Sequence, residues 1–175
     1  MFPEFQTERF LLLQIMPDDQ PFIFEGLSHP QVIPHYGVQY KTLEETSAQM
    51  QYYSQLLRDG TGAWWKIVDR QTTQNLGAIG YNNYSASHRK CEVGYWLLPQ
   101  HWGRGIAAET LQTVMSYLFR EKQVHRIEAL IELENVKSSG VAERAGFMLD
   151  GLLRDYEWKV DRFISLRLYS RLATD

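Results

Sequence analysis

The residues with the clearest chemical pattern are the six of the segment QHWGRG, at positions 100–105, which separate an apolar run from an amphipathic run. A helix that begins directly after a strand leaves its first N–H groups unpaired and its positive dipole end exposed, which suits an anion such as a phosphate group. Gly103 and Gly105 let the backbone approach a ligand, and Arg104 adds a positive charge. A tight turn without a ligand is the alternative interpretation.

Two other phosphate-binding loops do not fit this segment. It lacks the G-K-[ST] ending of a Walker loop, and Ala108 stands where G-x-G-x-x-G has its third glycine. The dinucleotide fingerprint tolerates alanine there, but it follows the first strand of a βαβ unit. Here the turn follows a series of predicted strands, which disfavours a dinucleotide site.

The strands that lead into the loop are predicted from runs of β-forming residues separated by turn-forming segments, a pattern typical of an antiparallel meander. The predicted strands cover residues 9–16, 63–69, 76–84, 90–98 and 125–133, with two closing strands over 147–159 and 161–172.

Four helices are predicted between these strands. One covers residues 17–27, and a second begins at Thr42 as N-cap, where Glu45 completes a capping box and Met50, Tyr53 and Leu57 form an apolar face. The third covers residues 105–120, and a short fourth covers 137–146. We therefore expect an α/β (α+β) fold with a mixed sheet of six or seven strands, in a single domain over residues 1–175.

The composition limits partners and location. The 18 Lys and Arg and 21 Asp and Glu leave a formal charge of -3, so no basic excess indicates direct binding of nucleic acid or of an anionic membrane. The single cysteine, Cys91, excludes an intrachain disulfide, and no Cys/His cluster has zinc-ligand spacing, so no metal is expected. The N-terminal residues resemble neither a signal peptide nor a membrane span, which predicts a cytoplasmic protein.

The segment QHWGRG matches the Q/R-x-x-G-x-G/A pyrophosphate loop of the GNAT superfamily of acyl-CoA-dependent N-acetyltransferases. Residues 91–109, CEVGYWLLPQHWGRGIAAE, resemble the branch that includes the ribosomal-protein N-terminal acetyltransferases, and residues 134–147, ENVKSSGVAERAGF, resemble a second motif of that branch. The order of predicted elements also agrees over nearly the whole chain. The resemblance implies a GNAT-like, mostly antiparallel sheet with splayed central strands and about four flanking helices.

The resemblance further implies acetyl-CoA as co-substrate, with its pyrophosphate held by backbone N–H groups of the loop and its pantetheine arm along the preceding strand. Asn135 would bind the pantetheine or the active-site backbone, and Ser138 would cap the next helix near the cofactor, although both residues suit a helix start without any ligand. Lys137 and Arg144 could reach the phosphates or be merely solvated. The residues expected to bind acetyl-CoA are Trp96, Leu97, Leu98, Gln100, His101, Trp102, Gly103, Arg104, Gly105, Ile106, Asn135 and Ser138.

Acetyl transfer to a neutral amine needs a proton acceptor, a donor to the oxyanion and a thiolate that can leave. By the resemblance, Glu92 is the candidate base, with an ordinary edge or salt-bridged carboxylate as the alternative, and a backbone N–H near Trp96 or Leu97 is the oxyanion donor. Many members of the family have a tyrosine acid where this chain has Ala142. Tyr156 is the candidate substitute, unless water serves or no acid is needed.

The acceptor is predicted to be the N-terminal α-amine of a protein, and the branch resemblance suggests a ribosomal protein. An α-amine has a pKa of about 8 and a lysine about 10.4, so a lysine costs roughly 3 to 4 kcal/mol more to deprotonate. Residues 34–40, PHYGVQY, carry no acid that would suit a polyamine, and Tyr36 and Tyr81 are the expected acceptor contacts. A polyamine, amino acid or xenobiotic acceptor, or a non-catalytic acyl-CoA-binding module, remains the alternative, as either a monomer or a homodimer.

Overall fold

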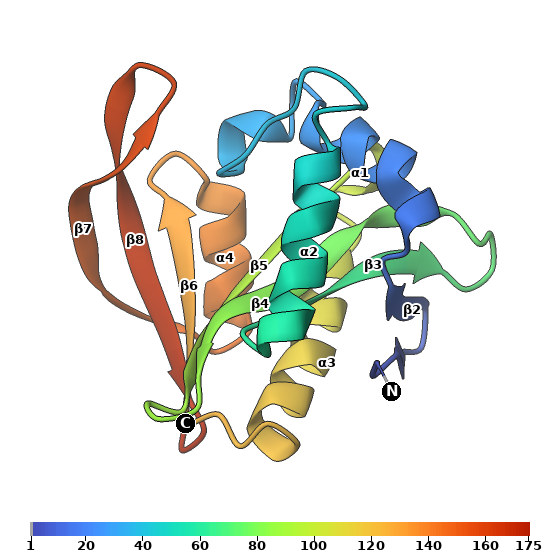
Figure 1. The fold of residues 1–175 in the computed structure, drawn as a ribbon. Coiled ribbons are helices and arrows are strands. Elements are labelled where there is room, and N and C mark those ends of the chain that lie inside the picture. Colours follow the sequence, from blue (N-terminus) through green and yellow to red (C-terminus); the bar gives the residue numbers. More distant parts are fainter. Residues whose placement is uncertain (1) are drawn as a thin grey trace.

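A computed structural model describes residues 2–175 as one eight-stranded sheet with helices on both faces (Figure 1). The sheet order is β1-β2-β3-β4-β5-β6-β8-β7. The strands are β1 (Phe5–Gln6), β2 (Phe10–Gln14), β3 (Ala63–Asp69), β4 (Asn75–Ser85), β5 (Lys90–Leu97), β6 (Arg126–Glu132), β7 (Met148–Lys159) and β8 (Arg162–Leu172). The helices are α1 (Gln20–Leu27), α2 (Ser47–Asp59), α3 (Ile106–Arg120) and α4 (Val136–Arg144), with short 3-10 turns η1 (Pro17–Asp19), η2 (Ile33–His35) and η3 (Pro99–His101).

The sheet is mixed because one pair of neighbours, β5 and β6, is parallel while the others are antiparallel. These two strands pair over only three positions, from Lys90 opposite Arg126 to Glu92 opposite Glu128. Beyond Glu92 they diverge, and Figure 1 shows β6 standing apart from β5 above their common base. The α+β architecture with splayed central strands is therefore confirmed.

The strand count is one higher than predicted. The additional strand, β1, has two residues, and Phe5 lies opposite Leu12 of β2. A strand of this length carries no alternation that a sequence pattern can reveal. The other seven strands lie where they were predicted, with ends that differ by at most two residues.

The second helix begins four residues later than the capping box predicted, with Thr46 rather than Thr42 as its N-cap. The Thr42 hydroxyl does accept a hydrogen bond from the Glu45 N–H, at 3.1 Å, but the Glu45 carboxylate accepts from Lys41 rather than from Thr42. Residues 43–46 form a turn, and the regular helix starts at Ser47. Its buried face contains Tyr53 and Leu56, whereas the predicted Leu57 is 39% exposed.

Two hydrophobic clusters form the core, one on each face of the sheet. The larger joins inward residues of the strands to α3 and α4, for example Val93 to Leu111 and Ala142. The smaller joins the opposite face to α1 and α2 and includes Trp64 and Trp96. Because side chains alternate along a strand, each position of β5 faces one layer or the other.

Among residues 2–175, no helix is long and apolar enough to cross a membrane.

Candidate active site

The loop between β5 and α3 has the backbone that its glycines predict. Gly103 has φ +74 and Gly105 has φ +73, both in the left-handed region that favours glycine. Gly105 is the N-cap of α3, and without a side chain it leaves the first N–H groups of the helix uncapped. The helix start is therefore available to an anionic ligand.

Side-chain contacts hold this loop in place from both sides. The Trp102 indole N–H donates to the Leu97 carbonyl at 2.8 Å, and Arg9 donates to the Arg104 carbonyl at 2.9 Å. Arg9 also pairs with Glu109 in the first turn of α3, at 2.7 Å. These contacts bind the loop to both β5 and the N-terminal part of the chain.

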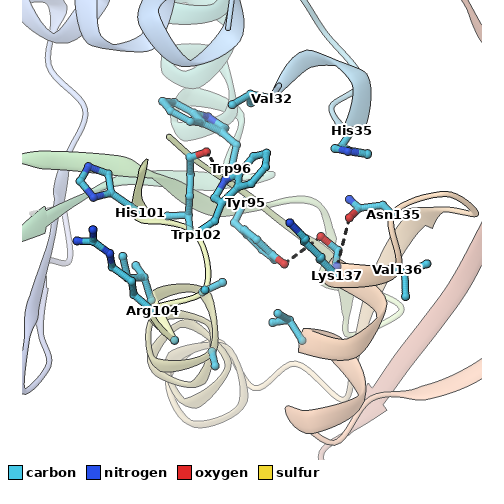
Figure 2. Close-up of a pocket in the computed structure, with 18 of the residues that line it drawn as sticks. Val32, His35, Tyr95, Trp96, His101, Trp102, Arg104, Asn135, Val136 and Lys137 are labelled. Carbon is cyan, nitrogen blue, oxygen red and sulfur yellow. Dashed lines mark hydrogen bonds between the residues drawn. The ribbon is translucent and has the colours of Figure 1, made fainter. Parts of the chain in front are cut away.

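The first of two cavities, of about 480 Å³, opens beside the loop (Figure 2). Its walls are the end of β5, residues 101–108 and the start of α4, and Figure 2 shows Tyr95, Trp102 and Lys137 reaching into the same space from these three elements. Lys137 lies 5.0 Å from the Trp102 ring centroid, and the guanidinium of Arg144 belongs to the same wall. Burial, together with nearby Arg104, lowers the pKa of His101 in the loop.

Most of the residues expected to bind the cofactor line this first cavity. Those that do are Trp96, Leu97, His101, Trp102, Gly103, Arg104, Gly105, Ile106, Asn135 and Ser138. Leu98 does not, because it is 3% exposed and packs in the smaller cluster with α1. Gln100 does not either, since its side chain is exposed on the outside of the η3 turn.

The edge of β5 that faces the gap has free backbone groups. The Leu98 N–H donates to the Leu76 carbonyl of β4, so by the alternation of an antiparallel ladder the Trp96 N–H also points to β4 and the Leu97 N–H points away from it. Leu97 and Tyr95 therefore present N–H groups to the gap between β5 and β6. Of the two predicted oxyanion donors, the geometry favours Leu97.

The start of α4 differs from the prediction in which residue caps it. Asn135 is the N-cap, and its side-chain oxygen accepts the Ser138 N–H at 3.2 Å. The helix begins at Val136, one residue earlier than predicted, which moves Ser138 into the first turn. Its hydroxyl instead lies 3.0 Å from the Tyr95 hydroxyl.

A second cavity, of about 810 Å³, lies on the other side of the gap and contains Glu92, Tyr36 and Tyr156. The two cavities meet, since five residues line both of them. These shared residues are His35, Tyr36, Tyr95, Asn135 and Ser138. A ligand in one cavity can therefore reach a ligand in the other at the gap between β5 and β6.

Glu92 lies on the wall of the second cavity with no cation beside it. The Asn83 amide donates to its carboxylate at 3.0 Å, and none of the ion pairs found among residues 2–175 includes Glu92. Burial raises the pKa of Glu92, and the nearby carboxylates of Glu157 and Glu128 act in the same direction. Glu92 is therefore not held in a salt bridge, and a raised pKa suits a base that works near neutral pH.

Tyr81 does not belong to the site. The register pairs Tyr81 with Val93 and Asn82 with Glu92, so Tyr81 and Glu92 point to opposite faces of the sheet. Tyr81 is 3% exposed, packs against Trp65 in the larger cluster and lines neither cavity. Tyr81 is therefore not retained as an acceptor contact, because its side chain is buried in the core and faces neither cavity.

Lys159 links the β7–β8 hairpin to β6 and to the segment before Tyr36. The Lys159 ammonium, at the tip of the β7–β8 hairpin, donates to the Pro34 carbonyl at 2.7 Å and pairs with Glu132 of β6. It thereby joins the hairpin to the segment that contains Tyr36. Tyr156, on the same hairpin, is 53% exposed and lines the second cavity but not the first.

The sequence analysis missed Tyr95, which lines both cavities, and Lys159, which anchors a hairpin that lines the second. Tyr95 was treated as an ordinary strand position, and Lys159 as part of a closing strand. The partners that give them a place in the site, Ser138 and Pro34, are far away in the chain, so no local pattern could have revealed either contact.

Comparison with known proteins identifies the family. Residues 9–148 match the model of the acetyltransferase (GNAT) domain. The chain is 32% identical over 171 residues to the uncharacterized N-acetyltransferase YoaA of Bacillus subtilis, which covers 97% of both proteins. It is 26% identical to the ribosomal-protein-serine acetyltransferase of Escherichia coli, over 92% of this chain and 85% of that protein.

Solved structures share the fold at lower identity. A putative ribosomal-protein-serine acetyltransferase from Vibrio cholerae superposes with a TM-score of 0.84 at 18% identity, over 97% of each chain. Spermidine N-acetyltransferase from the same organism, in complex with CoA and spermine, also gives 0.84, at 20% identity, over 96% of this chain and 98% of that one.

Proposed function

This chain belongs to the GNAT family of N-acetyltransferases, which use acetyl-CoA, and we propose that its acceptor is the N-terminal α-amine of a protein, with ribosomal proteins as the first candidates. The observation that carries the proposal is the position of Glu92, a carboxylate of raised pKa on the wall of the larger cavity, close to where that cavity meets the first. The name of the Escherichia coli relative supports the choice of acceptor.

Acetyl-CoA is proposed to bind in the first cavity. The N–H groups at the start of α3 and in the glycine loop suit its pyrophosphate, and Arg104, Lys137 and Arg144 line the same cavity with positive charge. The pantetheine arm would pair with the free edge of β5 and carry the thioester to the junction of the two cavities. Leu98 and Gln100 are no longer proposed to bind the cofactor, because neither lines the first cavity.

In the proposed reaction Glu92 removes a proton from the attacking amine, directly or through a water molecule. The Leu97 N–H donates to the oxygen of the tetrahedral intermediate, because it points into the gap. Each group is available without a conformational change of the strand that carries it.

An α-amine suits this site better than a lysine because it is easier to deprotonate. The roughly 3 to 4 kcal/mol of additional deprotonation that a lysine needs would have to come from the surroundings. The second cavity is wide enough for several residues of an extended peptide, and its aromatic wall of Tyr36, Tyr52 and Trp64 offers contact area to such a peptide.

A polyamine is the second candidate, since the structure adds acids that residues 34–40 lack. Glu132 and Glu157 line the second cavity together with Glu92, although Lys159 neutralises Glu132. A ligand with several ammonium groups would be attracted by Glu92 and Glu157. We rank it lower because an α-amine costs less to deprotonate and because the Escherichia coli relative is named for a protein acceptor.

The test is release of free CoA thiol against ribosomal-protein N-terminal peptides, the same peptides with blocked N-termini, and spermidine. We expect turnover only with free N-termini, and a loss of about 10²- to 10⁴-fold in kcat for Glu92→Gln with unchanged CoA affinity. Glu121→Gln, at the far end of α3, is the control and should behave as wild type.

Each outcome points to one interpretation. Turnover with spermidine but no peptide would establish the second candidate. Tight CoA binding without any turnover would favour an acyl-CoA-binding module. Full activity of Glu92→Gln would remove Glu92 from the mechanism whatever the acceptor.

A further inference from the structure

Two hydroxyl groups meet where the two cavities join. The Tyr95 hydroxyl, from β5, and the Ser138 hydroxyl, from the first turn of α4, lie 3.0 Å apart, and both residues line both cavities. In the proposed function the thioester must occupy this junction, because the sulfur and the acceptor amine come from opposite cavities. The leaving sulfur would therefore depart next to this pair.

One of the two O–H groups in this pair is available to donate to a ligand. Each hydroxyl carries one O–H hydrogen, and a single hydrogen bond between the two oxygens uses only one of them. When Ser138 donates to Tyr95, the Tyr95 O–H is free to donate to a ligand. This direction also suits an acid, because a donor to the phenol oxygen stabilises the charge that develops there.

The other three shared residues are less suited to give up a proton. The Asn135 amide is not an acid, and its oxygen already caps α4. Burial raises the pKa of Tyr36 well above its usual value, and the neighbouring tyrosines Tyr53, Tyr52 and Tyr40, together with Glu92, add to this effect. His35 is exposed at the end of the η2 turn.

The charges around Tyr95 differ from those around Tyr36. Burial raises the pKa of Tyr95 too, but the Ser138 hydrogen bond and the Arg144 guanidinium on α4 both act to lower it. Tyr156 lies on the exposed hairpin and does not line the first cavity, so it is farther from the path of the cofactor.

We propose that the Tyr95 hydroxyl is the proton donor to the departing CoA thiolate, with Ser138 as the residue that orients it. This inference rests on the proposed function only in requiring the thioester to lie at the junction. As the tetrahedral intermediate collapses, the C–S bond breaks, its electron pair stays on sulfur, and the Tyr95 proton moves to it. Glu92 then releases the proton that it took from the amine, and a proton from solvent restores the neutral Tyr95 hydroxyl. In total, one amine and one acetyl-CoA give one amide and one CoA thiol.

The first experiment needs no acceptor. It follows the ultraviolet absorbance of the thiolate during a pH titration of CoA bound to wild type, Tyr95→Phe and Tyr156→Phe. A hydroxyl that donates to the sulfur stabilises the thiolate, so we expect the pKa of the bound thiol to be higher in Tyr95→Phe than in wild type and unchanged in Tyr156→Phe.

The second experiment measures kcat with whichever acceptor is turned over. Tyr95→Phe should lower kcat by about 10²-fold or more while the Kd of CoA stays within about threefold, and Ser138→Ala should lower it by less. Tyr84→Phe, at a residue that lines neither cavity, should keep wild-type kcat. Replacement of Tyr95 by a fluorinated, more acidic tyrosine should restore turnover and move its alkaline limb to lower pH.

An unchanged thiol pKa in Tyr95→Phe overturns the proposal, even if no acceptor has been found. A full loss of activity in Tyr156→Phe with wild-type activity in Tyr95→Phe transfers the role to the hairpin. If peptides are inert and spermidine is acetylated, the proposed acceptor fails, yet the Tyr95 result remains valid because the leaving group is the same.

Discussion

Replacing Gly103 by alanine tests whether the loop backbone binds the cofactor. At φ +74 an L-residue costs roughly 1 to 2 kcal/mol, offset by about 0.4 to 1 kcal/mol from the smaller entropy of the unfolded chain. An added Cβ would meet no atom within 4 Å, so no steric term adds to this cost. The expected loss of stability is therefore about 1 kcal/mol, or about 2 to 4 °C in Tm for a chain of this size.

Gly60 provides the matched control. It has φ +67, an added Cβ would also meet nothing within 4 Å, and it ends α2 away from both cavities. Gly60→Ala should therefore lose the same stability as Gly103→Ala. Any difference between the two variants then reports on the ligand rather than on the backbone cost.

The difference is expected in the affinity for acetyl-CoA. The open space beside Gly103 belongs to the first cavity, where the methyl group would disturb the proposed pyrophosphate contacts. The loss of one hydrogen bond to a charged group is worth about 1.5 to 3 kcal/mol, which corresponds to a Kd raised about tenfold to a hundredfold. Calorimetric titration with CoA and thermal unfolding of both variants measure the two effects separately. Equal Kd values for Gly103→Ala, Gly60→Ala and wild type would refute the proposed role of the loop.

Three further predictions concern the surroundings of the site. Lys159→Met should raise the acceptor KM without changing the Kd of CoA, because the hairpin loses its hydrogen bond to Pro34. Steady-state kinetics measure this effect, and a change confined to CoA binding would contradict the prediction. Against the effect of burial, hydrogen bonds from Thr7 and Arg9 lower the pKa of Glu109, so its stabilising contribution is present above about pH 4.3 and is lost as pH falls. Denaturation of Glu109→Gln and wild type at about pH 6 and about pH 3 should show a stability difference that shrinks in acid, whereas a constant difference would disprove the assignment. Tyr81→Phe should keep the kinetics of wild type, and an altered acceptor KM would return this residue to the site.

The main elements and the cofactor loop could be predicted because their signals are local. The strand from Ala63 to Asp69 was predicted with its observed ends, since its tryptophans and β-branched residues form a run that is bounded by turns. The loop followed from two glycines directly before an amphipathic helix, and both adopt positive φ. These properties depend on neighbours in the chain.

The errors concern contacts between distant parts of the chain. The face of Tyr81 depends on the register between β4 and β5, which a hydrophobic run such as LGAIGY does not specify. Leu98 was expected in the cofactor site because it continues β5, but it packs below α1. The late start of α2 reflects competition between a helix and a turn that both satisfy the Thr42 side chain.

The short pairing of β5 with β6 has a mechanical consequence. Along the sheet, the part formed by β1 to β5 and the part formed by β6, β8 and β7 are joined at only three ladder positions, which lie at one end of the gap. Tyr95 lies three residues beyond the last of them, roughly 10 Å away at about 3.3 Å per residue. A rotation of about 5° around this narrow attachment would widen the gap at Tyr95 by about 1 Å, the scale of a small hinge motion. The gap that leaves room for the thioester therefore also lets a small rotation of one half against the other widen the site. Such a rotation would ease the entry of reactants and the release of products.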